Sequence, residues 1–379
     1  MSQLNVDTIK KADGTGNLSV PAETGTVVTT ASPSLGRRNL IINGAMQVAQ
    51  RGTSASTGGV NGYFACDRWK ILSNTEDVLT ISQSSDVPDG FASSLKAEVT
   101  TADTDFLTSE YARFEQKIEG NNLSQLKFGT ANAQDITLSF WVKSSITGGY
   151  SAGFIHLGAV SNAYISQQYT INEANTWEYK TLTFTGQTED GFTYDNTEGL
   201  RLLLTLSAGS DFTGGTSNTW GDVTHANVGQ TANVIGTLNA TFQITGVQLE
   251  VGTVATPFEH RSYGEELALC QRYYYTVSRA SANTSACIGH FYANNYFRGV
   301  IHFPVEMRSA PTIESNTGTN YFRVATNGAV HNFPSFLVDY KNTTSTAFYN
   351  TGLSGGTSGH GAELFIDNAS AYLAVDAEL

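Results

Sequence analysis

The feature of this sequence that most limits its fold is a long series of short segments in which apolar and polar residues alternate. In the segment ITLSFWVKS (136–144), Leu138, Phe140 and Val142 face one side of an extended chain, and the residues between them face the other. Turn-forming clusters of glycine and threonine, such as 147–149 and 213–216, separate these segments. Short alternating segments separated by such turns predict two antiparallel sheets packed face to face.

The same pattern predicts strands along most of the chain. Up to residue 260 they are 39–44, 68–72, 78–82, 94–99, 111–118, 136–144, 164–171, 177–186, 200–207 and 240–252. Beyond the predicted helix they are 286–292, 296–303, 321–326, 336–340, 346–351 and 371–379.

Composition supports the all-β fold class and excludes two kinds of partner. Charged residues make up 15% of the chain, against about 25% in an ordinary globular protein, and there are 37 glycines. Long surface helices favour Glu, Lys and Arg, which are scarce here. The net charge of -13 argues against binding to nucleic acid, whose phosphates need a basic surface. No stretch approaches the roughly 18 apolar residues that would insert into a membrane.

Four segments follow from these patterns. Residues 1–36 have too few apolar residues to close a core and are expected to form an extended arm that becomes ordered against a partner. Residues 37–260 are expected to form a β-sandwich, and 261–275 a connecting helix. Residues 276–379 are expected to form a smaller second β domain.

The helix prediction rests on a capping box. Ser262 precedes Glu265 by three residues, so its hydroxyl can accept from the Glu265 amide while the glutamate reaches back to the serine amide. A helix of about three turns is therefore expected from this point.

Several motifs together resemble a family of bacteriophage tail-fibre and virion proteins. NLIINGAMQVAQRG (39–52) and CDRW (66–69) resemble the opening of its main module. GVQLEVG (246–252), ATPFEHRS (255–262) and CQRYY (270–274) resemble the close of that module. FPVEMR (303–308) with APT (310–312) resembles the β domain that often follows it.

The resemblance implies a jelly-roll domain similar to carbohydrate-binding modules, in which acidic residues often hold a calcium ion. Here Gln47 stands where a glutamate is usual, and the late segment has Glu250 without paired aspartates. Asn43, Glu250 and backbone carbonyls make a poor calcium set, so neither a metal nor a cofactor is predicted. The three cysteines, Cys66, Cys270 and Cys287, are expected to be free thiols.

The function that the resemblance implies is structural. The chain is expected to be a homotrimeric tail-fibre subunit of a virion, assembled in the host cytoplasm because its first residues lack the apolar core of a signal peptide. Residues 1–36 would attach it to other phage tail proteins, and its β domains would adhere to a host-surface glycan. A capsid decoration protein and a polysaccharide-degrading tail enzyme are the alternatives.

Loop aromatics with polar neighbours are the candidate glycan contacts, because sugar rings stack on flat side chains. They are Trp220, Phe212, Tyr194, Asn196, Asn218 and Asp222. Trp220 alternatively pins its own loop. Trp69, Trp141 and Trp177 occur within strand patterns and are expected in the core.

No catalytic residues are predicted. Glycoside hydrolysis needs two carboxyl groups about 5–10 Å apart. Glu115 and Glu119 would share one face of a strand, and Glu110, Glu189, Asp190 and Asp195 are also acidic, but each is expected on a solvated surface.

Two further sets are expected to be structural. The aromatic residues of the last domain are expected in its core and in subunit interfaces, with receptor contact as the alternative; they are Tyr321, Phe322, Phe333, Phe336, Tyr340, Phe348 and Tyr349. The sandwich opening is expected to be locked by Asn43, Gly44, Arg51, Asp67, Arg68, Trp69 and Glu250, with the Asp67–Arg68 pair contacting Glu250 or Glu259.

Overall fold

The chain divides into two compact units, residues 1–38 and 39–379. The computed structural model describes residues 9–10, 17–18, 38–279, 284–326 and 328–379. In the first unit, β1 (Ile9–Lys10) pairs antiparallel with β2 (Asn17–Leu18). The rest of the predicted arm lies outside the described residues, and its attachment to the particle stays a prediction.

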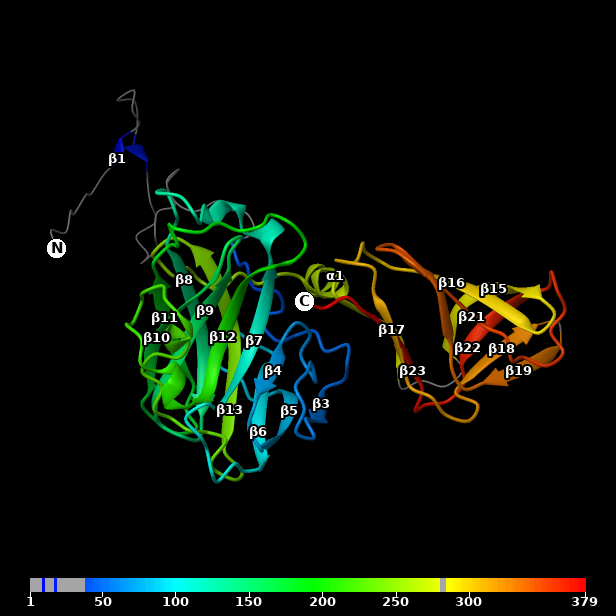
Figure 1. Cartoon of the computed structure of the whole chain (residues 1–379), viewed down its shortest axis with the longest axis horizontal. Helices are drawn as coiled ribbons and strands as arrows, with labels where there is room; N and C mark the ends of the chain where they lie inside the picture. Colours follow the sequence, from blue (N-terminus) through cyan, green and yellow to red (C-terminus); the bar gives the residue numbers. More distant parts are fainter. Residues whose placement is uncertain (1–8, 11–16, 19–37, 280–283, 327) are drawn as a thin grey trace. The chain divides into compact units, whose positions relative to one another are not determined.

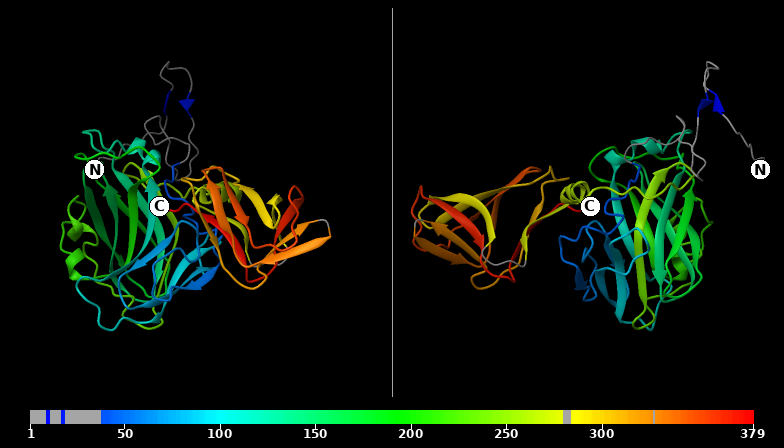
Figure 2. Two further views of the ribbon diagram at one scale, coloured as in Figure 1. Left: turned by 45° about the vertical axis from the view of Figure 1, so that its right-hand side comes forward. Right: turned by 180° about the vertical axis from the view of Figure 1, so that it is seen from behind.

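Two antiparallel sheets of the second unit form the predicted sandwich (Figures 1 and 2). The five-stranded sheet runs in the order β10 (Asn162–Ile171), β9 (Gly148–Leu157), β12 (Glu198–Ala208), β7 (Tyr111–Glu119) and β4 (Lys70–Ser73). The six-stranded sheet runs in the order β11 (Glu178–Phe184), β8 (Ile136–Ser144), β13 (Thr241–Val251), β6 (Ser94–Thr101), β5 (Val78–Ser84) and β3 (Ser54–Ser56). The all-β fold class is confirmed.

Alternating residues of both sheets form the core between them. Phe114 and Phe154 come from the five-stranded sheet, and Phe140 and Phe242 from the six-stranded sheet; all four are fully buried. Because side chains alternate along a strand, each of these strands also presents a second row of side chains to the outside of the sandwich.

Two segments differ from the sequence prediction. Residues 39–44 are not a strand, and that prediction is wrong: Asn43 has φ 57°, and side chains rather than a neighbouring strand satisfy the backbone, with Gln116 Oε1 accepting from the Ile42 amide at 2.8 Å. Conversely, Gly148 and Gly149 begin the central strand β9 instead of forming a turn. Gly149 lies close to Gln168 and Thr231, where a side chain would clash.

The helix α1 (Tyr263–Gln271) begins at the predicted capping box. Both reciprocal hydrogen bonds between Ser262 and Glu265 are present. Strand β14 (Tyr274–Arg279) starts three residues after the helix ends, inside the range expected to be helical. No helix of the described residues is long and apolar enough to cross a membrane.

Two more sheets follow the helix. The smaller has the order β14, β23 (Tyr372–Asp376) and β17 (Thr312–Ser315). The larger has the order β19 (Ala329–Phe333), β18 (Phe322–Thr326), β22 (Gly361–Ile366), β15 (Thr284–Ala293), β16 (Tyr296–His302), β21 (Ser345–Asn350) and β20 (Leu337–Lys341). Phe322, Phe333 and Phe348 are buried in their core, as expected, whereas Tyr340 is exposed.

Polar residues at the sandwich opening hold one another in place. The Asn43 side chain donates to the carbonyl oxygens of Val48 and Asp67, and the Trp69 indole donates to the Asn43 carbonyl at 3.1 Å. Gly44 allows close approach, because a Cβ there would lie 2.1 Å from the Val247 carbonyl oxygen.

Arg68 pairs with Glu378, near the end of the described chain, so its predicted pairing with Glu250 or Glu259 is wrong. Arg51 also bonds Glu378, at 3.3 Å, and Asp376, at 2.9 Å. The predicted partners are used elsewhere: Glu250 accepts from Gln248, and Glu259 from the Asn39 amide. The pairing could not be anticipated because it joins residues 310 positions apart.

An arginine lies at a cluster of oxygen atoms beside the same opening. The Arg261 guanidinium donates to the carbonyl oxygens of Asn39 and Ile41 and pairs with the carboxylates of Glu259 and Glu266. Arg261 therefore supplies the positive charge that balances these oxygen atoms.

Candidate functional site

The outer face of the five-stranded sheet carries rows of polar side chains whose order follows from the strand register. One row crosses the sheet from Tyr164 on β10 through Ile155 and Arg201 to Lys117 on β7. The next row runs through Gly153 and Leu203 to Glu115 on β7 and Lys70 on β4. A third contains Thr205, Arg113 and Leu72. Alternation along each strand places these residues on the side away from the core.

Consecutive contacts join four of these residues and three neighbours into one series of seven side chains, which we call the charged ladder. It consists of Phe212, Tyr111, Arg113, Glu115, Arg201, Glu198 and Lys117, each contacting the next. The Phe212 and Tyr111 rings meet edge to face at 5.3 Å, and the Arg113 guanidinium lies 4.3 Å from the centre of the Tyr111 ring. The ladder thus extends from a loop aromatic, across two strands, to Lys117.

Arg201 is the best-held cation of the ladder. Its Nε and NH2 donate to the two carboxylate oxygens of Glu198 at 2.5 and 2.9 Å, and its NH1 lies 3.6 Å from Glu115 Oε2. Burial alone would lower the pKa of Arg201, but these carboxylates outweigh burial and raise it. A guanidinium fixed in this way loses little conformational entropy when it binds a ligand.

Glu115 is 1% exposed, although it lies on the outside of a sheet. Its Oε1 accepts from Arg113 Nε at 2.7 Å, and its Oε2 has no hydrogen-bond partner. Burying charge is costly and seldom improves stability over an apolar side chain. The carboxylate is therefore best explained as a group that holds Arg113 and Arg201 in position.

The expectation that Glu115 and Glu119 are solvated is wrong. Glu119 is equally buried and receives two hydrogen bonds from Arg272, at 2.8 and 2.7 Å, and a third from the Tyr273 hydroxyl. Burial alone would raise the pKa of Glu119, but these donors keep it below its ordinary value. The two carboxylates do share a face, yet four residues of strand separate them by about 13 Å, too far for a hydrolytic pair.

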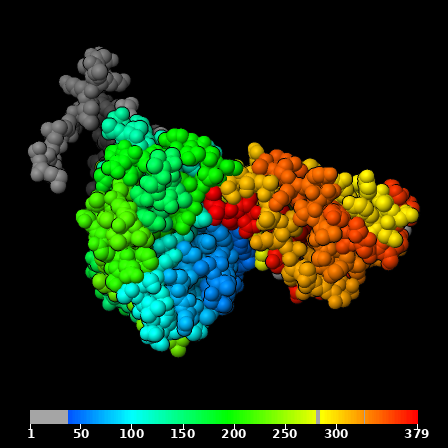
Figure 3. Space-filling model, in the orientation of Figure 1, coloured from blue at the N-terminus to red at the C-terminus, as the bar shows by residue number. Residues whose placement is uncertain are grey.

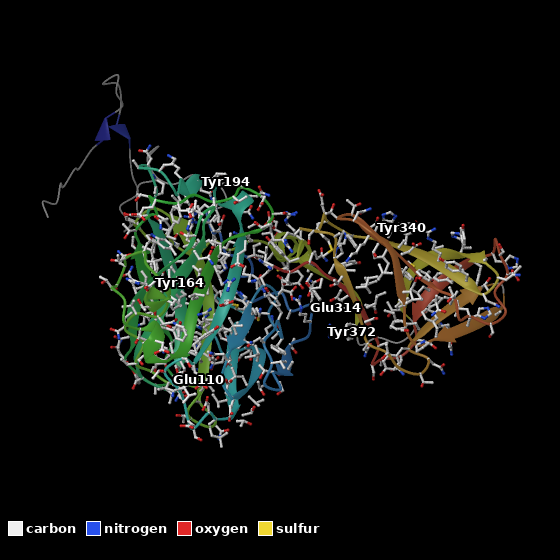
Figure 4. The ribbon with its side chains drawn as sticks, in the orientation of Figure 1. Glu110, Tyr164, Tyr194, Glu314, Tyr340 and Tyr372 are labelled. Atoms are coloured by element: carbon white, nitrogen blue, oxygen red, sulfur yellow. The ribbon has the colours of Figure 1, made fainter. Side chains whose placement is uncertain are left out.

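Loop 209–240 brings some of the predicted glycan contacts to the edge of this face. Gly221 forms a bridge with Tyr164 and so extends the first row beyond β10. Its neighbour Asp222 is exposed and caps a short 3₁₀ helix. Asn218 Oδ1 accepts a hydrogen bond from the Thr185 amide at 3.1 Å. Figure 4 labels Tyr164 midway along the sandwich and Tyr194 at its upper end.

The remaining candidates are dispersed. Phe212 lies at one end of the charged ladder, whereas Tyr194 is exposed beside Phe192. The Asn196 side-chain amide donates to the Arg308 carbonyl at 2.6 Å, and the Asn196 backbone carbonyl accepts from the Arg308 guanidinium at 3.0 Å. Sequence reasoning missed Tyr164, Arg113 and Arg201; a detectable signal was charge at alternate positions of an otherwise apolar strand, as in residues 111–118.

Trp220 pins its loop, as the alternative interpretation expected. Its indole donates to the Thr185 carbonyl at 2.8 Å, and its ring packs against Phe128 and His156. His156 is fully buried with neither ring nitrogen hydrogen-bonded. Burial lowers the pKa of His156 to about 4, although the charge of Asp190 opposes this.

This histidine predicts a specific loss of stability in acid. Its folded-state pKa lies below the 6.5 of an ordinary histidine, so between these values the unfolded chain binds the extra proton. Neutral His156 costs no stability above pH 6.5. The free energy of unfolding then decreases as the pH falls toward 4, and the loss reaches about 2.5 kcal/mol near pH 4.5. We expect His156→Leu to remove this component, measured as the difference between urea unfolding free energies at pH 7 and 4.5. An equal acid sensitivity in both proteins would contradict the assignment.

The four tryptophans do not share one role. Trp69 is buried in the core as expected, but Trp141 and Trp177 are half-buried on the outer side of the six-stranded sheet, so their predicted core position is wrong. Trp141 has the same parity along β8 as Ser139 and Lys143, which also face outward.

The described part of the chain contains no group of three or more His, Cys, Asp or Glu residues that could hold a metal ion. Its cysteines are free, with Cys66 and Cys270 buried and Cys287 half-buried.

Comparison with known proteins shows likeness in structure but not in sequence. No family model matches the chain, and no curated protein matches it. The enzymatically active domain of tailspike protein 4 from bacteriophage CBA120 is 17% identical, with a TM-score of 0.32 over 56% of this chain and 21% of that chain. The chain therefore spans about a fifth of that protein's length.

Carbohydrate-binding modules are among the other similar structures. The C-terminal family 22 module of Clostridium thermocellum Xyn10B is 11% identical, with a TM-score of 0.29 over 50% of this chain and 89% of the module. The family 11 module of the cellulosomal cellulase Lic26A-Cel5E, also from C. thermocellum, is 11% identical, with a TM-score of 0.27 over 52% and 95%. The likeness is one of fold: an all-β chain with a sandwich similar to those of carbohydrate-binding modules.

Proposed function

We propose that this chain is a virion adhesin, a tail-fibre-type subunit whose sandwich binds a host-surface glycan along the charged ladder. The observation that carries the proposal is the Arg201 guanidinium, held by Glu198 and Glu115 on an outward sheet face, with Tyr164 two strands away in the same row. A planar guanidinium offers parallel N–H donors to adjacent sugar oxygens, and a neighbouring tyrosine offers a ring edge and a hydroxyl. The side of the sandwich drawn in Figure 3 is broad and without a deep hollow, which suits an extended polysaccharide.

The proposed action is binding without cleavage. The carboxylates of the charged ladder are engaged in ion pairs with two arginines and a lysine and do not form the facing carboxyl pair that hydrolysis needs. We expect no new reducing ends when the protein is incubated with a polysaccharide that it binds.

The proposed assembly is a homotrimer anchored to other tail proteins through residues 1–36. It is supported by exposed apolar residues on the outer face of the seven-stranded sheet, where Val300 and Ile288 lie on adjacent strands and Val330 lies further along the row, beyond Glu363 and Ala325. All three are exposed, Ile288 at 79%. Such a surface is suited to contact between sister chains. Sedimentation equilibrium at three times the chain mass is the expected result.

Replacing Arg201 tests the glycan proposal. We expect Arg201→Met to weaken binding to a bacterial polysaccharide about ten- to a hundredfold, because one charge-assisted contact contributes roughly 1.5–3 kcal/mol. The measurement is a bacterial glycan array followed by surface plasmon resonance on the strongest ligand. Tyr164→Ala should weaken the same ligand without disturbing the ion pairs.

The matched control is Arg298→Met, which removes a partly exposed arginine paired with Asp339 in the seven-stranded sheet. It should leave binding unchanged. A normally folded Arg201→Met variant with wild-type affinity would exclude the charged ladder as the binding surface.

A further inference from the structure

Aromatic side chains gather on the outer face of the six-stranded sheet, opposite the charged ladder. Trp141 on β8 and Tyr179 on β11 are direct partners across the two strands, with ring centroids 5.4 Å apart. Trp177 lies just before β11, and the outward Lys143 of β8 lies 5.8 Å from the centre of its ring, which places it on the same side. Three large rings therefore occupy neighbouring positions on one outward surface.

A glycine allows this group to continue along the sheet. Gly246 has φ 60°, and a Cβ there would lie 2.6 Å from the Phe91 ring and 3.2 Å from the Trp141 ring. The absence of a side chain lets both rings lie over the backbone. Phe91 then packs against Phe258 at 5.2 Å. We call Trp177, Tyr179, Trp141, Phe91 and Phe258 the aromatic platform.

The platform is only partly buried by the protein itself. Tyr179 is 46% exposed and the other four rings are half-buried, whereas the core tryptophan Trp69 is 2% exposed. The neighbouring outward positions on β8, Thr137 and Ser139, are buried at 0% and 2% exposure, so the partial exposure of the rings is particular to the platform. A group of partly exposed rings on a stable sheet indicates a binding surface.

Paired charges border the platform and fix its rings. Asp86 accepts from the Trp177 indole at 3.1 Å and from Lys143 at 2.5 Å. The hydrogen bonds from Lys143 and Trp177 lower the pKa of Asp86, although its partial burial opposes them. Asp86 neutralises Lys143, so this border offers donors and acceptors for hydroxyl groups without a net charge to select an acidic ligand.

We propose that the aromatic platform is a second carbohydrate site, specific for neutral hexopyranose oligosaccharides, on the opposite side of the sandwich from the charged ladder. The C–H face of a pyranose ring stacks on Trp141 and Tyr179, and its hydroxyls bond Asp86 and Lys143 at the border. Rigid aromatic side chains bind at low entropic cost because they have few torsions to fix. The site goes beyond the proposed adhesin role, since it does not depend on Arg201.

Isothermal titration with cellohexaose, laminarihexaose and maltohexaose tests the site, with tryptophan fluorescence as a second readout. We expect at least one of these probes to bind and to shift the fluorescence. Trp141→Ala and Tyr179→Ala should each weaken it about tenfold, the factor that corresponds to about 1.4 kcal/mol. Tyr340→Ala is the control, because Tyr340 is a 69% exposed ring in the seven-stranded sheet. Tyr340→Ala and Arg201→Met should both bind the neutral probe with wild-type affinity.

Three results would overturn the proposal: no binding of any probe to the wild type, unchanged affinity in Trp141→Ala, or a change in sedimentation mass in that variant, which would show a protein contact instead. The two sites fail separately. If the bacterial polysaccharide loses affinity in Arg201→Met while the neutral hexasaccharides keep theirs in Trp141→Ala, the charged ladder stands and the platform does not. If the polysaccharide keeps its affinity in Arg201→Met while the hexasaccharides lose theirs in Trp141→Ala, the ladder is excluded and the platform stands.

Discussion

Arg68→Ala is expected to lower the free energy of unfolding by about 3–5 kcal/mol, the cost of breaking a buried ion pair. The Arg68 side chain is 1% exposed, pairs with Glu378, donates to the Lys117 carbonyl at 2.7 Å and lies 3.4 Å from the centre of the Tyr273 ring. Alanine removes all three contacts and leaves the buried Glu378 carboxylate with Arg51 alone. Urea denaturation followed by circular dichroism measures the change.

The control for this variant is Lys96→Ala. Lys96 pairs with Glu98 on a partly exposed strand surface, where such a pair contributes less than about 1 kcal/mol. Binding of glycan should survive in Arg68→Ala, because Arg68 is not part of the charged ladder. An Arg68→Ala variant no less stable than Lys96→Ala would show that the Glu378 contact does not hold the chain together.

Arg261→Met is expected to have an effect of similar size, about 3–5 kcal/mol. Its guanidinium supplies hydrogen bonds to the carbonyl oxygens of Asn39 and Ile41, the latter at 3.0 Å, and to the carboxylate of Glu266 at 3.3 Å. Methionine keeps most of the side-chain volume and removes the charge and every donor. Thermal melting and urea unfolding at neutral pH measure the loss.

Arg298→Met is the matched substitution at a partly exposed ion pair and should cost less than about 1 kcal/mol. Because Arg261 supplies the cation at this oxygen cluster, the wild-type melting temperature should be the same in EDTA and in calcium chloride. A melting temperature that falls in EDTA would contradict this account of the cluster.

Strand alternation predicted much of the fold because it is a local property of the sequence. Residues 136–144 form β8 as expected, and 111–118 match β7 to within one residue. The capping box likewise fixed the start of α1, since Ser262 and Glu265 are close in sequence. Strand β9 was missed because its first residues, Gly148 and Gly149, read as a turn when their packing against Thr231 is unknown.

The candidate site was harder to predict because its contacts are not local. Glu115 was expected in solvent, yet its second partner, Arg201, comes from a strand that is more than eighty residues away in the chain and adjacent in the sheet. The same holds for Arg68 and Glu378. Pairing of this kind depends on strand order, which alternation alone does not specify.

The outward tryptophans show the opposite case, in which a local signal was present. Leu138, Phe140 and Val142 face the core, so Trp141 has outward parity, as does Trp177 relative to Tyr179. Their position within strand patterns favoured the core in the sequence interpretation, but the two-residue period of the strand decides the face. For a strand with one buried face, parity is the better guide.

The most direct test of the central claim is amide chemical-shift mapping of the isotope-labelled protein with the polysaccharide that it binds most strongly. The account predicts that the largest shifts fall in β7, β12 and β10, around Arg113, Arg201 and Tyr164, and that the ligand remains uncut throughout the titration. Shifts confined to the strands of the seven-stranded sheet, or shortening of the polysaccharide during the experiment, would contradict it.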